Sequence, residues 1–135
     1  MPRSASPPEM NGEISHIAKN GVLHVSVTGQ IVLADVVDHV IRHLDLWQSQ
    51  TRILWDLRSY QQLAEVSSSL REISIGFRKV LKLRAGGLSA LVVNDQNGLG
   101  LARRLINHME LNQVDVRFKE FTSVERAEDW LLGQL

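Results

Sequence analysis

The chain has 135 residues, the length of one domain, and its 15 basic residues balance 15 acidic ones. This neutral balance gives no indication of nucleic-acid binding, and the absence of cysteine excludes disulfides, thiolate metal sites and cysteine nucleophiles. No apolar run is long enough to predict a membrane span. Residues 1–12 are rich in proline and polar residues and lack the apolar core of a signal peptide. We therefore expect a disordered tail over 1–12 and one cytoplasmic domain over 13–135.

A β-hairpin is the first predicted element. Asn20-Gly21 separates two β-prone runs, and both residues tolerate the positive φ of a tight hairpin turn. This loop predicts that His16 pairs with Val25. Since residues 23, 25 and 27 form the apolar face of the second strand, His16 is expected on or near the core face, either as a buried titrating group or as a histidine at the sheet rim.

Helices and strands alternate after the hairpin. Apolar residues recur at helical spacing from Leu33 to Trp47, and similar patterns cover 67–84 and 99–110. Short apolar runs at 52–57 and 88–93 and the alternating residues 114–118 predict three further strands. Thr122-Ser-Val-Glu125 has the form of a capping box, so a last helix is expected to begin at Thr122. The order predicts an α/β fold: a mainly parallel sheet, an N-terminal antiparallel hairpin and four main helices.

Four stretches in this order resemble elements of the SpoIIAA-like proteins of the STAS superfamily. They are the strand-then-glycine segment 25–30, the strand ending in Asp-Leu within 52–58, the strand 89–95, and the closing strand and helix 118–132. The resemblance covers residues 13–135. It implies a small regulatory or ligand-binding domain of a group compared with anti-sigma factor antagonists, for which nucleotide or lipid binding has been suggested.

The chain departs from the antagonists at their phosphorylation segment. Those proteins carry an Asp-Ser-Ser-Gly-type sequence where this chain has Ser67 and Ser68 without the Asp or the Gly. The serines are typical of helix caps, and phosphorylation of either is the alternative, because a phosphate at a helix N-terminus is electrostatically favourable.

Polar residues follow two predicted strands and form the first candidate site. In open parallel sheets, ligands gather at the carboxyl ends of the strands. The candidate ligand-binding residues are Asp56, Arg58, Ser59, Asn94 and Asp95. The alternative is that Asn94 and Asp95 only form turns and caps.

The predicted helix over 67–84 is locally basic and forms a second candidate surface. A basic amphipathic helix can contact lipid headgroups, the phosphates of a small ligand, or an acidic protein, although a solvated helix face also has this composition. The candidate contact residues are Arg71, Arg78, Lys79, Lys82 and Arg84.

Asp35, His39 and His43 are spaced i, i+4, i+8 on one side of the first predicted helix. Two histidines four residues apart can chelate a divalent metal, but without a further ligand in sequence a solvated helix face is the favoured interpretation. We therefore predict no metal site and no cofactor. Nickel binding during purification would be incidental.

Three hypotheses for function follow. The first is a non-catalytic regulatory or ligand-binding STAS-like domain that takes a small molecule such as a nucleotide, a lipid or a protein partner. The second is an interaction module or homodimer that uses the basic helix or the sheet edge. The third is a small enzyme that uses Asp56 or Asp95 with a nearby histidine. Because no nucleophile elbow, phosphate-binding loop or cysteine is present, we expect no catalytic activity.

Overall fold

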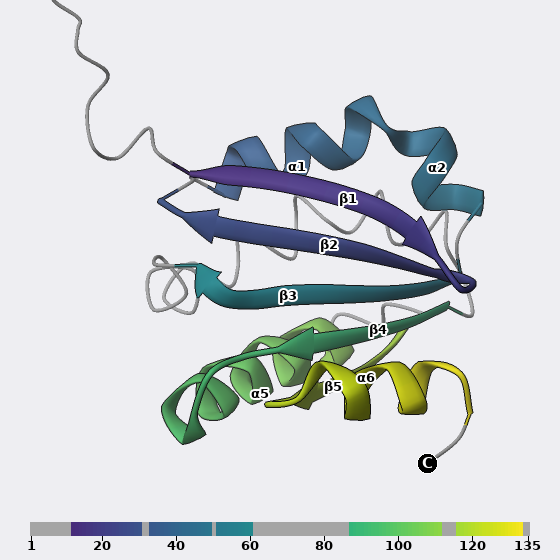
Figure 1. The fold of residues 1–135 in the computed structure, drawn as a ribbon. Coiled ribbons are helices and arrows are strands. Elements are labelled where there is room, and N and C mark those ends of the chain that lie inside the picture. Colours follow the sequence, from purple (N-terminus) through teal and green to yellow (C-terminus); the bar gives the residue numbers. More distant parts are fainter. Residues whose placement is uncertain (1–11, 31–32, 50, 61–86, 112–115, 134–135) are drawn as a thin grey trace, which may run out of the picture.

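The computed structural model describes residues 12–30, 33–49, 51–60, 87–111 and 116–133. Five strands form one sheet in the sequential order β1-β2-β3-β4-β5, with β1 antiparallel to β2 and the remaining neighbours parallel (Figure 1). The strands are β1 (Glu13–Lys19), β2 (Val22–Gly29), β3 (Arg52–Tyr60), β4 (Gly87–Val92) and β5 (Val116–Phe121). The sheet confirms the predicted α/β class with its N-terminal hairpin.

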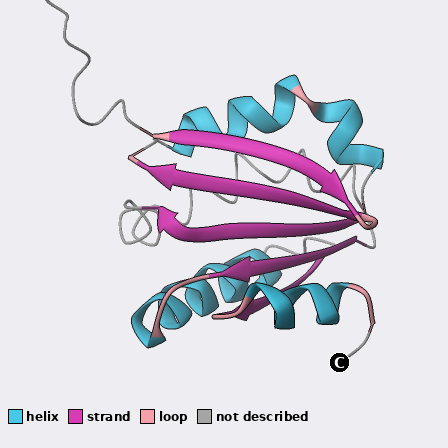
Figure 2. Cartoon of the chain, viewed as in Figure 1, coloured by secondary structure: helices cyan, strands magenta, loops and turns pink. Residues whose placement is uncertain are grey.

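The described helices are α1 (Leu33–Arg42), α2 (Leu44–Ser49), α5 (Gln96–Leu111) and α6 (Val124–Leu131) (Figure 2). The predicted first helix is thus divided at His43, whose N–H lies 3.2 Å from the carbonyls of both His39 and Val40. Among the described residues, no helix is both long and apolar enough to cross a bilayer.

The hairpin has the predicted register. Asn20 and Gly21 have φ values of 55° and 78°, and His16 pairs with Val25. Because side chains alternate along a strand, this register assigns each residue of β1 to one face of the sheet. His16 is therefore on the same face as Val25, whereas Ser15 and Ile17 are on the other.

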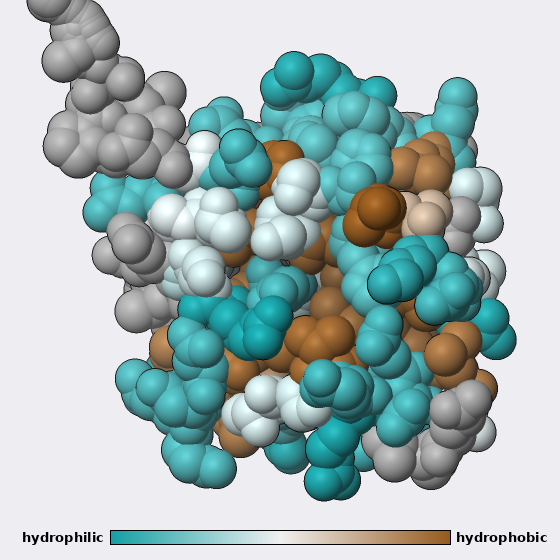
Figure 3. All heavy atoms as spheres, viewed as in Figure 1, coloured by the Kyte–Doolittle hydropathy of each residue, from teal (hydrophilic) through white to brown (hydrophobic). Residues whose placement is uncertain are grey.

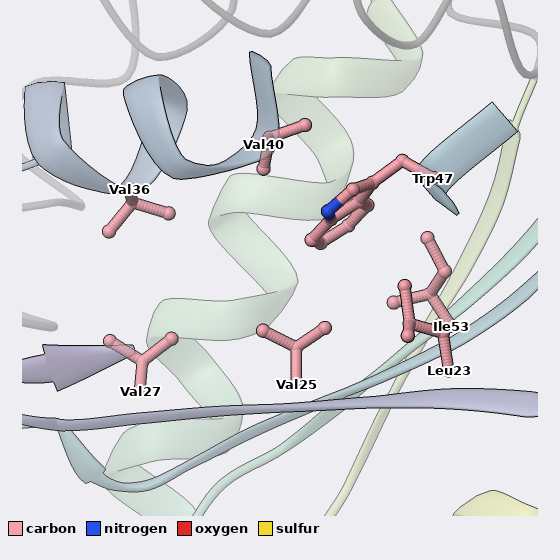
Figure 4. Packing of buried hydrophobic residues seen from close by; sticks show 7 residues of the cluster. All are labelled: Leu23, Val25, Val27, Val36, Val40, Trp47 and Ile53. Atoms are coloured by element: carbon pink, nitrogen blue, oxygen red, sulfur yellow. The ribbon is translucent and has the colours of Figure 1, made fainter. Parts of the chain in front are cut away.

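We call the two sides of the sheet the back face and the front face. On the back face, α1 and α2 pack on β2 and β3: Val36, Val40 and Trp47 point toward a strand surface (Figure 4) formed by Leu23, Val25, Val27 and Ile53. Helix α5 covers the same face farther along, where Ala102 and Ile106 pack on Leu91 and Val93. Ile41 was predicted within this apolar stripe but is 53% exposed, because it lies one residue beyond the buried Val40.

The front face carries α6, which contacts β3, β4 and β5. Ala127 and Leu131 of this helix pack on Leu54, Ala90 and Val92. The helix begins at Val124, two residues later than predicted: Ser123, not Thr122, is the N-cap, and its side chain accepts a hydrogen bond from the N–H of Arg126. None of the described helices covers β1 on this face, and this exposed part of the sheet contains the candidate site.

Candidate functional site

Asp56, Arg58 and Ser59 were predicted to follow a strand, but they lie within β3, which extends to Tyr60, and the first two form an ion pair. Arg58 donates from Nε to Oδ1 of Asp56 at 2.9 Å and from Nη2 to Oδ2 at 2.8 Å. The two side chains lie on the front face, where they line a common cleft with Leu54 and Val124. The pairing of β2 with β3 shifts between Ser26 and Thr28, so β3 carries one extra residue here. Such bulges change the direction of nearby side chains.

Asn94 and Asp95 have local structural roles after β4. The side-chain amide of Asn94 donates to the carbonyl of Arg58 and thereby joins the ends of β3 and β4. Asp95 Oδ1 accepts from the N–H of Gly98 at 2.9 Å, which caps α5. The helix α5 therefore begins at Gln96, three residues before the helical pattern predicted from residue 99. Ser59 is exposed.

The ion pair fixes the charge state of Asp56. The hydrogen bond from Arg58 lowers the pKa of this carboxyl below its ordinary value against the opposing effect of burial. The same contact raises the pKa of Arg58. Asp56 is consequently ionised at neutral pH with both oxygens occupied. This state is poorly suited to a general acid or base, which works best with a pKa near the operating pH.

A cleft of about 240 Å³ lies on the front face beside this pair, and we call it the front cleft. Figure 3 views this face and shows hydrophobic and hydrophilic residues side by side across it. Its lining includes Ser15, Ile17, His24, Ser26, Asp56 and Arg58.

The rim of the front cleft combines an exposed apolar side chain with polar side-chain contacts. Ile17 is 63% exposed, which makes it the most exposed large hydrophobic residue in the described part of the chain. His24 Nε2 lies 3.4 Å from Glu128 Oε2 of α6. The hydroxyl of Ser123 donates to Glu125 at 2.9 Å and, together with a contact to the Glu125 backbone amide, lowers the pKa of this carboxyl.

Three histidines from two elements meet at the back-face side of β1. His16 Nδ1 lies 3.0 Å from His39 Nε2, and the ring of His43 packs on both at centroid distances of 4.8 and 4.4 Å. Burial lowers the pKa of His39, as do the neighbouring His43, His16 and Arg42, while Asp38 opposes this shift. The sequence pattern of the helix indicates only the pair of His39 and His43, and the hairpin register indicates the face on which His16 joins them.

Several predicted residues lie outside the part of the chain that the structure describes. These are the candidate phosphorylation sites Ser67 and Ser68 and the candidate basic surface of Arg71, Arg78, Lys79, Lys82 and Arg84. Both therefore remain predictions.

Comparisons with known proteins match the fold. No family model matches the sequence, and no curated protein matches it. The structure is similar to a crystal structure of an anti-sigma factor antagonist from Mycobacterium paratuberculosis. The TM-score is 0.56 at 17% sequence identity, over 95% of this chain and 99% of the other. Together with the hairpin followed by parallel strands, this likeness shows that the chain has the fold of that anti-sigma factor antagonist, as the resemblance to SpoIIAA-like proteins predicts.

Proposed function

We propose that this chain is a non-catalytic regulatory domain that acts by binding a protein partner at the front cleft. The similar structure is named as an anti-sigma factor antagonist, and the likeness extends over nearly the full length of both chains. By analogy, we propose an anti-sigma factor as the partner class.

The observation that carries this proposal is the form of the front cleft. Its volume of about 240 Å³ is smaller than the roughly 300–1,000 Å³ of typical small-molecule pockets. It has room for one or two side chains of another protein. The exposed Ile17 at its edge offers an apolar contact of the kind found at the centre of protein interfaces.

The charges around the front cleft favour a protein over a nucleotide or a lipid headgroup. Phosphate recognition uses the guanidinium fork of arginine, but Nε and Nη2 of Arg58 are bound to Asp56. The same pairing weakens the case for an enzyme that uses the Asp56 carboxylate. Asp95 is likewise engaged, as the cap of α5.

The test is titration of the purified chain with each anti-sigma factor of its source organism by isothermal calorimetry. We expect one to bind, and Ile17→Lys to weaken that binding at least about 10-fold, since it places a charge where an apolar side chain would be buried. Ile41→Lys is the matched control, because Ile41 is 53% exposed on α1, which covers the back face. It should bind like the wild type.

Four outcomes would overturn the proposal. Equal losses in both lysine variants would mean that the front cleft is not the contact. Binding of a nucleotide or of anionic vesicles without any anti-sigma factor would favour the ligand hypothesis. A homodimer in light scattering that dissociates in Ile17→Lys would make a second copy the partner. Measurable turnover that depends on Asp56 would favour the enzyme.

A further inference from the structure

The three histidines at the back-face side of β1 form a cluster that shares only His16 with the lining of the front cleft. His16 comes from β1, His39 from the last turn of α1, and His43 from the junction between α1 and α2. His16 and His39 are half-buried, whereas His43 is exposed. The cluster therefore joins an edge strand to a helix and has a side open to solvent.

The ring nitrogens lie at distances close to those of a metal site. One nitrogen from each histidine can be chosen so that all three lie within 4.8 Å of one another, and the shortest pair is 3.0 Å apart. Two imidazole nitrogens on a tetrahedral Zn²⁺ are about 3.3 Å apart, given Zn–N bonds of about 2.0–2.1 Å. His39 and His16 already span this distance. Closing the longest separation requires a movement of about 1.5 Å, which small side-chain rotations shared among the three histidines can supply.

A backbone contact orients one of the rings for this role. His43 Nδ1 lies 2.8 Å from the carbonyl oxygen of His39 and donates its hydrogen to it. This bond leaves the lone pair of His43 on Nε2. Histidine ligands of metals are commonly fixed in this way by a hydrogen bond from the other ring nitrogen.

The contact between His16 and His39 is also compatible with an ion. Without an ion, one of the two facing nitrogens must carry a proton and donate it to the other. A cation between them would take the place of that proton, which would move to the other nitrogen of the same ring. The neighbouring charged residues Arg42 and Asp38 pair with each other on the exposed side of α1. The Asp38 carboxylate therefore does not take the place of a histidine ligand, and the charge of Arg42 is balanced.

We propose that His16, His39 and His43 form a binding site for a divalent transition metal, with Zn²⁺ as the best fit. Three neutral imidazoles suit Zn²⁺, Ni²⁺ and Cu²⁺ and are a poor match for Mg²⁺ or Ca²⁺, which prefer oxygen ligands. Water would complete the coordination on the exposed side.

Such an ion would fasten the edge strand β1 to the α1–α2 junction. The hairpin is otherwise attached to the rest of the sheet through β2 alone. His39 and His43 lie outside the lining of the front cleft, and the metal site does not depend on the proposed partner. Its test needs only the purified chain, so its failure would leave the partner proposal intact.

The experiment is a titration of the untagged, chelator-treated chain with ZnCl₂ by isothermal calorimetry, together with the visible spectrum after addition of Co²⁺. We expect a single site and the intense d–d bands of tetrahedral Co²⁺. At a free Zn²⁺ concentration one hundred times Kd, the melting temperature should rise by on the order of 10 °C.

Three variants separate this site from incidental binding. His43→Gln removes an exposed ligand and should leave the fold intact, while His16→Gln removes the ligand from β1; each should weaken Zn²⁺ binding at least about 10-fold. His24→Gln, on the opposite face of the sheet, is the control and should bind like the wild type. If His16→Gln binds Zn²⁺ with the affinity of the wild type, then the ion is bound by the helical pair of His39 and His43 alone, and the proposal is refuted. Absence of Zn²⁺ binding in the wild type would refute it as well.

Discussion

Two glycines at the start of α5 offer a direct test of the packing at the end of β4. Both are helical and two residues apart, but Gly98 is buried whereas Gly100 is exposed. A Cβ added at Gly98 would lie 3.0 Å from Cβ and 3.3 Å from Cγ2 of Val93, a side chain that is 1% exposed. A Cβ added at Gly100 would contact nothing within 4 Å. The same substitution to alanine thus meets two different environments.

The expected effects differ in sign. Alanine in a helix interior is about 1 kcal/mol more favourable than glycine, because glycine loses more backbone entropy on folding. Gly100→Ala should therefore stabilise the chain by about 0.5–1 kcal/mol. At Gly98 the same gain is opposed by overpacking against Val93, which costs about 1–3 kcal/mol because a Cβ cannot rotate away. Gly98→Ala should be destabilised by about 1 kcal/mol, which separates the two variants by about 2 kcal/mol.

The free energy of unfolding is measured by urea titration, followed by circular dichroism and by the fluorescence of the three tryptophans. For a domain of this size, the predicted separation corresponds to melting temperatures about 8 °C apart. If Gly98→Ala is as stable as Gly100→Ala, then α5 does not approach Val93 as closely as the structure shows. The assignment of Asp95 as a purely structural cap would then lose its support.

Two further predictions concern single hydrogen-bonding groups. Asp56→Asn should lower stability at neutral pH by at most about 1 kcal/mol, because both partners of its ion pair are partly exposed to solvent. Because the folded-state pKa of Asp56 is lowered, its contribution to the free energy of unfolding is complete above the ordinary aspartate pKa and is lost as the pH falls through the lowered value. The free energies of unfolding of the wild type and of Asp56→Asn, measured by urea titration, should therefore converge in acid. A difference that stays constant with pH would contradict this. Ser123→Ala should lower the free energy of unfolding by about 1 kcal/mol, because it removes the N-cap of α6. Thr122→Ala is the matched control at an exposed position and should lower it little. Equal losses in the two variants would indicate that Thr122 is the cap.

The sheet could be predicted from sequence because its signals are local. Asn20-Gly21 fixes the hairpin turn, and alternation then determines which residues of β1 and β2 face the helices. The apolar run that became β4 is buried along most of its length, whereas β3 is buried only at Ile53 and Leu54 and becomes exposed toward Arg58. Boundaries were less predictable. The helix α5 begins earlier than the apolar spacing indicated, because Asp95 caps its N-terminus by a hydrogen bond to a backbone N–H. Such a cap needs no hydrophobic neighbour, so the apolar pattern does not reveal it.

The candidate sites depend on contacts between distant segments. Their residues could therefore be predicted from the sequence, but the side chains that those residues contact could not. Asp56 and Arg58 were predicted as free ligand-binding groups, yet their spacing of two on one strand lets them bind each other. The histidine pair on the helix was interpreted as a solvated face because its third member is 23 residues away from His39, on β1. Combining the hairpin register with the helix face would have revealed the cluster.

The hairpin register connects the two proposals on opposite sides of the sheet. Adjacent residues of β1 point in opposite directions, so Ile17 reaches the front cleft while His16 reaches the helical histidines. A shift of the register by one residue would exchange them, placing an isoleucine among imidazoles and a histidine at the apolar rim. Ile14 of β1 packs against the back-face core and opposes that shift, since the shift would turn this side chain away from the core. The stability of the core therefore maintains both surfaces, although neither surface contributes much apolar burial itself.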